Sequence, residues 1–143
     1  MAACDLCKNL GGELLYEGTR FRVVLVDEPN YPGFCRVIWN EHVREMTDLA
    51  AEDREMLMWV VWQVETAVRE VMRPNKINLA SLGNMTPHVH WHVIPRYSDD
   101  AHFPNPVWGE VKRVPDEAVL AKRAGLVQDL RATIAKIKFP SAW

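Results

Sequence analysis

The sequence predicts a single α+β domain: an antiparallel meander sheet with one long helix and a C-terminal helix. Its 143 residues are 48% apolar and 25% charged, a size and balance typical of one globular domain. Short β-branched or alternating segments stand on both sides of one long segment with helical periodicity. No internal repeat, low-complexity tract or glycine–serine linker divides the chain.

Three strands are predicted first. Glu13–Tyr16 is a short strand, and Phe21–Asp27 is a β-branched run typical of a buried strand. Pro29–Gly33 is a turn by composition, and Phe34–Trp39 is the next strand.

A long helix follows, for which Thr47 or Asp48 is the expected N-cap and Pro74 the end. Its inward face is expected to carry apolar residues at helical spacing, which are Leu57, Val60, Val61, Val64, Val68 and Val71. We then expect strands at Lys76–Leu82 and His88–Ile94 and a second helix at Asp116–Lys138. The predicted order is β-β-β-α-β-β-α, with the strands pairing without crossover connections.

Charge and hydropathy exclude two classes of partner. The formal net charge is −2 and the basic residues are dispersed, so a nucleic-acid polymer is disfavoured, although a single nucleotide is not. No stretch approaches the roughly 20 apolar residues that span a bilayer, so we expect no membrane insertion. With three cysteines and no recognisable signal peptide, the expected location is the reducing cytoplasm.

Three of the five histidines lie in the segment His88–His92 at alternate positions. Because side chains alternate along a strand, His88, His90 and His92 are expected to share one face. The alternatives are chance placement, or one core histidine and two on the surface. A single metal ion bound by all three is disfavoured, because the outer pair would lie roughly 13 Å apart along a strand.

Nucleophilic catalysis is the interpretation that these residues favour. Crowding of three imidazoles disfavours protonation of all of them, which keeps the central ring neutral and able to attack. His90 has a histidine on either side, and we therefore predict that it is the nucleophile.

The segment from His88 to Ile94 resembles the signature of the histidine triad (HIT) family, in which three histidines alternate with apolar residues. The resemblance runs from Cys4 to about Trp108. It implies one HIT domain over residues 1–143 with a HIT-like fold, a core at about 4–108 and a C-terminal helical extension at 115–138.

The resemblance implies a nucleotide hydrolase or nucleotidyl transferase that cleaves at the α-phosphate of an adenosine-type dinucleotide or phosphoramidate. His90 would form a nucleotidyl-histidine, His92 would contact the phosphate or leaving group, and His88 would support the arrangement, with no cofactor required for the chemistry. Asp27 matches an acidic residue that binds ribose hydroxyls; a solvated aspartate at the end of a strand is the alternative.

Two departures from the family pattern bear on the substrate. Phe34 stands where many members carry a histidine, and the loop before the triad is shortened to residues 83–87. In that loop, Asn84 carries an amide that can bind phosphate, whereas Met85 has no group to protonate or orient a leaving group. A non-catalytic nucleotide- or zinc-binding HIT module is therefore the alternative function.

Cys4 and Cys7 have the spacing of metal ligands, although one such pair is a weak signal. Similarity to bacterial triad proteins that begin with this pair adds His42 and His88, which implies a structural zinc ion with four protein ligands. Two free thiols are the alternative. Cys35, in an apolar strand, is expected to be a core residue.

The sequence also gives expectations for four side chains outside the triad and the cysteine pair. Arg96 is expected either to place positive charge near a phosphate or to be solvated, and His102 to be a surface loop residue. Trp59 and Trp62 are expected to lie off the core face of the long helix. The resemblance implies a homodimer built around that helix and its neighbouring strand; a monomer with both rings in its own core is the alternative.

Overall fold

A computed structural model describes residues 4–143. Its five strands form one sheet in the order β1-β2-β3-β5-β4, and every neighbouring pair is antiparallel. The strands are β1 (Glu13–Glu17), β2 (Phe21–Leu25), β3 (Cys35–Trp39), β4 (Lys76–Ala80) and β5 (His90–Arg96). The helices are α1 (Asp5–Lys8), α2 (Ala51–Met72), α3 (Glu117–Ala124) and α4 (Val127–Ala135), with a 3-10 turn at Met46–Asp48.

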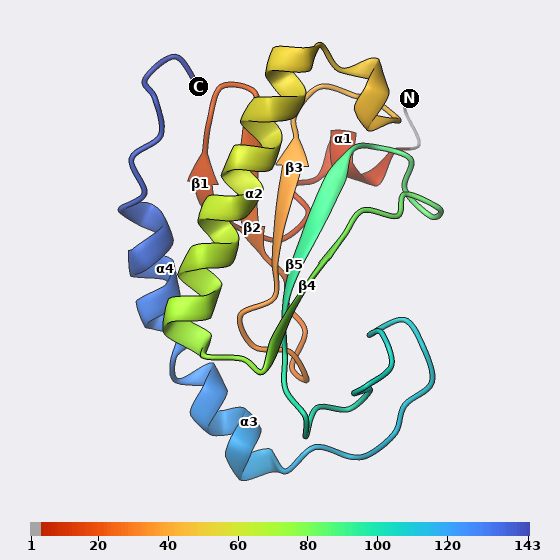
Figure 1. The fold of residues 1–143 in the computed structure, drawn as a ribbon, viewed down its shortest axis with the longest axis vertical. Coiled ribbons are helices and arrows are strands. Elements are labelled where there is room, and N and C mark those ends of the chain that lie inside the picture. The colour runs from red at the N-terminus through yellow and green to blue at the C-terminus, as the bar shows by residue number, and fades with distance from the viewer. Residues whose placement is uncertain (1–3) are drawn as a thin grey trace.

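The predicted fold class is confirmed, but the strand order differs from a simple meander. β5 lies between β3 and β4, so the connection from β3 through α2 reaches the far edge of the sheet before β5 returns beside β3 (Figure 1). The expectation that no connection would cross another strand was therefore wrong. As a result, β5 is an inner strand, paired on both sides, and its side chains are held at fixed positions.

One face of the sheet is covered by α2, with α4 packed beside it against α2 and β1 (Figure 1). The core between them contains Val23 and Val37 of the sheet and Leu57, Val60 and Val64 of α2, all fully buried. Burial of such side chains is the main favourable contribution to folding. Val71, predicted on the same helix face, is half-buried against this core.

Several boundaries differ from the sequence prediction. α2 begins after Ala50, because Glu45 and Asp48 form a capping box around the preceding 3-10 turn; neither Thr47 nor Asp48 caps the long helix. The C-terminal helix is interrupted at Gly125–Leu126 into α3 and α4. Helix α1 was not predicted. Among residues 4–143, no helix has the length and hydropathy needed to cross a membrane.

Candidate functional site

The sheet face opposite α2 carries the two later triad histidines. In the register of β3 and β5, Ile38 pairs with His90 and Arg36 with His92. Val37, between those two β3 residues, lies in the core with α2, so Arg36 and Ile38 face the other way. His90 and His92 are 8% and 5% exposed, which places both imidazoles in a largely desolvated setting.

His88 does not belong to β5, contrary to the prediction that the strand begins there. Its backbone N–H donates to the Thr86 carbonyl, and the next residue, Val89, donates to the Val43 carbonyl outside the regular ladder. Its buried ring donates from Nε2 to the main-chain oxygen of Trp39, at 2.5 Å. Because a carbonyl only accepts, the Nδ1 atom of neutral His88 has a free lone pair.

His90 is held in one tautomer by the backbone. Its Nδ1–H donates to the main-chain oxygen of His88 at 2.6 Å, so Nε2 of the neutral ring carries the lone pair. Burial lowers the pKa of His90, and the nearby charge of Arg36 lowers it further, whereas the bond to the carbonyl opposes the shift. The ring is therefore neutral at neutral pH and has an unprotonated Nε2 atom.

A cavity of about 550 Å³ lies beside His90. It is lined by the short helix α1 and the chain that follows it, by β3 and by the turn before β5; the lining residues are Asp5, Leu6, Asn9, Gly11, Arg36, Thr86 and His90. The volume is within the range of small-molecule sites. This cavity is the candidate nucleotide phosphate site.

His92 is surrounded by aromatic rings and one cation. Its ring makes edge-to-face contacts with Phe34 at 5.6 Å and with Trp108 at 5.0 Å between centroids. Arg36 donates from Nε to Nδ1 of His92 at 3.4 Å, which leaves the proton of the neutral ring on Nε2. Burial, with His90 and Arg36 nearby, lowers the pKa of His92 to about 3. His92 is thus a neutral Nε2–H donor.

Cys4, Cys7, His42 and His88 converge at the end of the site nearest the N-terminus. Their four candidate ligand atoms all lie within 4.8 Å of one another. Nδ1 of His88 lies 3.5 Å from the Cys4 sulfur and 3.6 Å from that of Cys7, and Nδ1 of His42 lies 3.3 Å from the Cys7 sulfur. Tetrahedral zinc bonds near 2.3 and 2.0 Å give ligand–ligand separations of about 3.5 Å. The cluster therefore fits a small metal ion.

The structure does not bring every predicted substrate-binding residue to the histidines. Asp27 is exposed and lines a separate cavity of about 670 Å³, formed by the loop after β2 together with α3 and α4. Asn84 is exposed in the turn that precedes the triad, where Gly83 has a positive φ of 75°. Both residues remain candidates for substrate binding.

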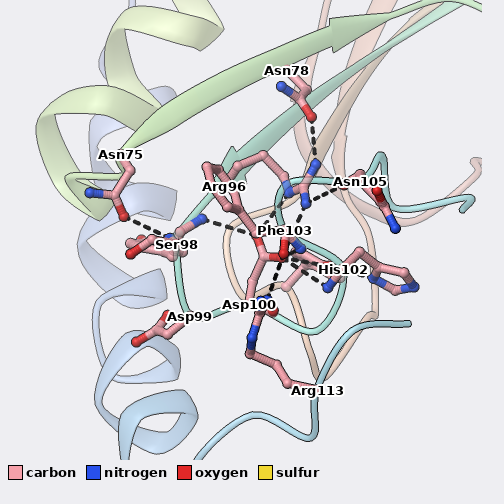
Figure 2. A network of polar contacts seen from close by, with 12 residues as sticks. Asn75, Asn78, Arg96, Ser98, Asp99, Asp100, His102, Phe103, Asn105 and Arg113 are labelled. Carbon is pink, nitrogen blue, oxygen red and sulfur yellow. Dashed lines mark hydrogen bonds and ion pairs between the residues drawn. The ribbon is translucent and has the colours of Figure 1, made fainter. Parts of the chain in front are cut away.

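Arg96 and His102 differ from their predicted settings. Arg96 is 2% exposed and pairs with the fully buried Asp100, so its charge is neither solvated nor free for a phosphate (Figure 2). Arg96 also donates to the Asn78 side chain and the Asn105 carbonyl. His102 is half-buried, and its Nδ1 lies 2.6 Å from the Tyr31 hydroxyl. This network ties the loop after β5 to the sheet.

Sequence reasoning missed two side chains that contact His92. Arg36 was overlooked, although it alternates with the core residues Cys35 and Val37 and so has to face away from α2. Trp108 follows the triad by 16 positions in an irregular loop, where no periodicity predicts its position. Figure 2 shows the network that fixes the first part of that loop.

Residues 8–99 match the HIT domain model, and the chain belongs to that family. The AP-4-A phosphorylase of Mycobacterium tuberculosis (strain H37Rv) is 29% identical over 98 residues, 64% of this chain and 50% of that protein. The chain thus spans about half the length of the curated relatives it matches.

Two solved structures share the fold. A histidine triad protein from Bradyrhizobium japonicum is 27% identical, has a TM-score of 0.69, and the match covers 85% of this chain and 91% of that one. A Zn-bound histidine triad family protein from Mycobacterium smegmatis is 24% identical, with a TM-score of 0.61 and coverage of 94% and 95%. At that identity, the second likeness shows the fold alone.

Proposed function

We propose that the chain is a nucleotide hydrolase or nucleotidyl transferase that works through a nucleotidyl-His90 intermediate. The observation that carries this proposal is the bond from Nδ1–H of His90 to the His88 carbonyl, because it leaves the Nε2 lone pair of a neutral ring available beside a cavity. The proposed substrates are adenosine-type dinucleoside polyphosphates and phosphoramidates.

The proposed reaction has two displacements. The Nε2 lone pair of His90 forms a bond to the α-phosphorus, and the bond from that phosphorus to the leaving group breaks, with its electron pair departing on the leaving group. An acceptor oxygen then attacks the same phosphorus, and the bond to Nε2 breaks and returns the lone pair to the ring. When the acceptor is water, its proton is released to solvent.

Three other side chains have proposed roles in binding the substrate. The Nε2–H of His92 donates to a phosphate oxygen or to the leaving group, as the bond from Arg36 supports. The amide of Asn84 lies on the turn beside the site and donates to phosphate when the nucleotide is bound. Asp27 accepts hydrogen bonds from ribose hydroxyls; its exposed position, two residues beyond the end of β2, is compatible with that role.

The acceptor is either water or phosphate. The curated relatives are named AP-4-A phosphorylases, which supports diadenosine tetraphosphate as the first substrate to test and inorganic phosphate as an acceptor. Attack by water would release AMP and ATP from this substrate, whereas attack by inorganic phosphate would release ADP and ATP. The products therefore identify the acceptor.

A structural zinc ion is proposed at Cys4, Cys7, His42 and His88. The separations of the ligand atoms support it, and so does the tautomer of His88, whose Nδ1 lone pair faces both sulfurs. The ion would brace the backbone whose carbonyl orients His90. Four protein ligands leave no open position for substrate, so no step of the reaction is assigned to the metal.

We also propose a homodimer in a reducing compartment such as the cytoplasm. β4 is an edge strand, which presents unpaired backbone groups. On α2, Trp62 is 54% exposed, and Glu65 and Arg69, one and two turns further along, line a groove with Lys76 and Ile77 of β4. Trp62, Glu65 and Arg69 thus form a stripe along α2 that leads to the edge strand β4. Trp59 does not belong to this stripe, because it packs against Phe139 and Trp143.

The test is turnover of diadenosine tetraphosphate, with and without inorganic phosphate, together with intact mass spectrometry of the enzyme after rapid mixing. Wild type is expected to gain the mass of one AMP group, and His90→Ala to lose both the adduct and turnover. His102→Gln, which changes a histidine outside the triad, is the control and should retain both. Nucleotide binding without turnover in wild type would instead establish the non-catalytic alternative.

A further inference from the structure

Arg36 places a guanidinium group beside His92, in the lining of the cavity that His90 also lines. It projects from β3 directly opposite His92. Its Nη1 donates to the Gly11 carbonyl at 3.0 Å and its Nε to Nδ1 of His92 at 3.4 Å, which fixes the plane of the group. An arginine has five N–H donors, so others remain for a ligand.

The charge of Arg36 has no counter-ion among residues 4–143, where no carboxylate lies within 4.0 Å of it. Arg96 and Arg22, which are more deeply buried than Arg36, are satisfied within the protein: Arg96 pairs with Asp100, and Arg22 donates to three carbonyls and the Asn40 side chain. Burial lowers the pKa of Arg36, as expected where a charge is desolvated without compensation. Such a cation favours the binding of an anion.

The position of Arg36 specifies where that anion lies. Arg36 and His90 line the same cavity, so a phosphorus within reach of Nε2 of His90 carries oxygens toward the guanidinium. Asp5 also lines this cavity, from the exposed side of α1. Arg36, which is half-buried, is the arginine among the residues that line this cavity, and no lysine is among them.

We propose that Arg36 is a substrate-binding residue that stabilises the anionic leaving group, so that the chain prefers phosphoanhydrides, such as dinucleoside polyphosphates, to phosphoramidates. The proposal rests on the function proposed above. When an anhydride is cleaved, negative charge develops on the departing phosphate, and a fixed cation stabilises it. The leaving group of a phosphoramidate is an amine. If the amine departs uncharged, Arg36 does not stabilise it, and if it departs as an ammonium ion, Arg36 repels it.

The test compares kcat and KM for diadenosine tetraphosphate and adenosine 5′-phosphoramidate in wild type, Arg36→Leu and Arg36→Lys. Arg36→Leu is expected to lower kcat/KM about 100-fold for the tetraphosphate and less than about threefold for the phosphoramidate. Arg36→Lys should recover part of the loss, because it restores the charge without the planar fork. Equal losses with both substrates, or no loss, would overturn the proposal.

A binding measurement keeps this test independent of catalysis. Calorimetry with tripolyphosphate is expected to show at least about tenfold weaker binding to Arg36→Leu than to wild type. Arg20→Leu removes an equal charge from an exposed arginine paired with Asp53, and it should bind as wild type does. Failure of wild type to bind, or equal affinities in all three proteins, would exclude the site. His90→Ala should lose turnover and keep this binding, which separates the two proposals.

Discussion

Asp100 and Arg96 form a two-bond ion pair inside the protein, from Nε to Oδ2 at 2.8 Å and from Nη2 to Oδ1 at 3.1 Å (Figure 2). Both side chains are almost completely buried, at 1% and 3% exposure. Asp100 also accepts from the backbone N–H groups of Tyr97, His102 and Phe103. The Asp100 carboxylate therefore fixes the backbone at the start of the loop that leads to Trp108.

Asp100→Ala is expected to destabilise the protein by about 3–5 kcal/mol, because it leaves Arg96 as an uncompensated buried charge. Asp99→Ala is the matched control, since its carboxylate pairs with Arg123 while 54% exposed. Exposed pairs contribute less than about 1 kcal/mol. Urea unfolding followed by circular dichroism measures both variants. Equal effects at the two neighbouring positions would contradict the interpretation of the network.

The same carboxylate predicts a dependence of stability on acid. Burial would raise the pKa of Asp100, but hydrogen bonds from Arg96 and the three backbone groups outweigh it and hold the pKa at about 2. A depressed folded pKa stabilises the protein above the unfolded value of about 4, and this contribution is lost as the pH falls toward 2. Unfolding at pH 7 and pH 2.5 should therefore show the penalty of Asp100→Ala shrinking, while that of Asp99→Ala stays small.

Purified protein is expected to contain about one zinc ion per chain. Cys7→Ser should lose it, and a chelator should lower the Tm of wild type by about 10 °C, since the metal binds the folded state. Cys35→Ala is the control, because that thiol is buried in the core and should leave the metal content unchanged. Metal-free wild type, after purification without chelator, would rule out the site.

Sequence periodicity predicted the shared face of His90 and His92 but not the order of the strands in the sheet. The alternation of His90 and His92 is a local property of one strand, and the structure places both on one face as predicted. Whether β5 pairs at the edge or between β3 and β4 depends on contacts between distant segments, about which a local pattern carries no information. The break between α3 and α4 at Gly125 was missed because the apolar residues keep their helical spacing across it, so the local pattern indicates one continuous helix.

Arg36 and Arg96 show why charged residues were harder to place. Each stands in a strand, where sequence alone favours a solvated guanidinium. The burial of Arg96 depends on Asp100, whose carboxylate is brought back by a tight turn after β5. The position of Arg36 depends on β5 lying next to β3, which is the same feature of the sheet order that was not predicted.

Trp108 is expected to contribute to binding of the nucleotide. Its indole is 51% exposed and packs edge-on against His92, so one aromatic surface is free beside the site. Base–aromatic stacking is worth about 1–3 kcal/mol, and Trp108→Ala should raise KM for diadenosine tetraphosphate about tenfold with less change in kcat. Trp108→Phe should retain most of the affinity. An unchanged KM in the alanine variant would show that the ring takes no part in binding.

Trp62 is expected to lie at the centre of the proposed dimer. Its exposed indole lies on the stripe of α2 that leads to Glu65, Arg69 and the β4 edge, and a buried tryptophan commonly contributes 2 kcal/mol or more to an interface. Trp62→Glu should therefore weaken association at least about 30-fold, which sedimentation velocity measures across a dilution series. Val114→Glu introduces the same charge at a 93% exposed position outside α2 and β4 and should sediment as wild type does. A monomer in wild type, or a dimer that Trp62→Glu leaves intact, would exclude this surface.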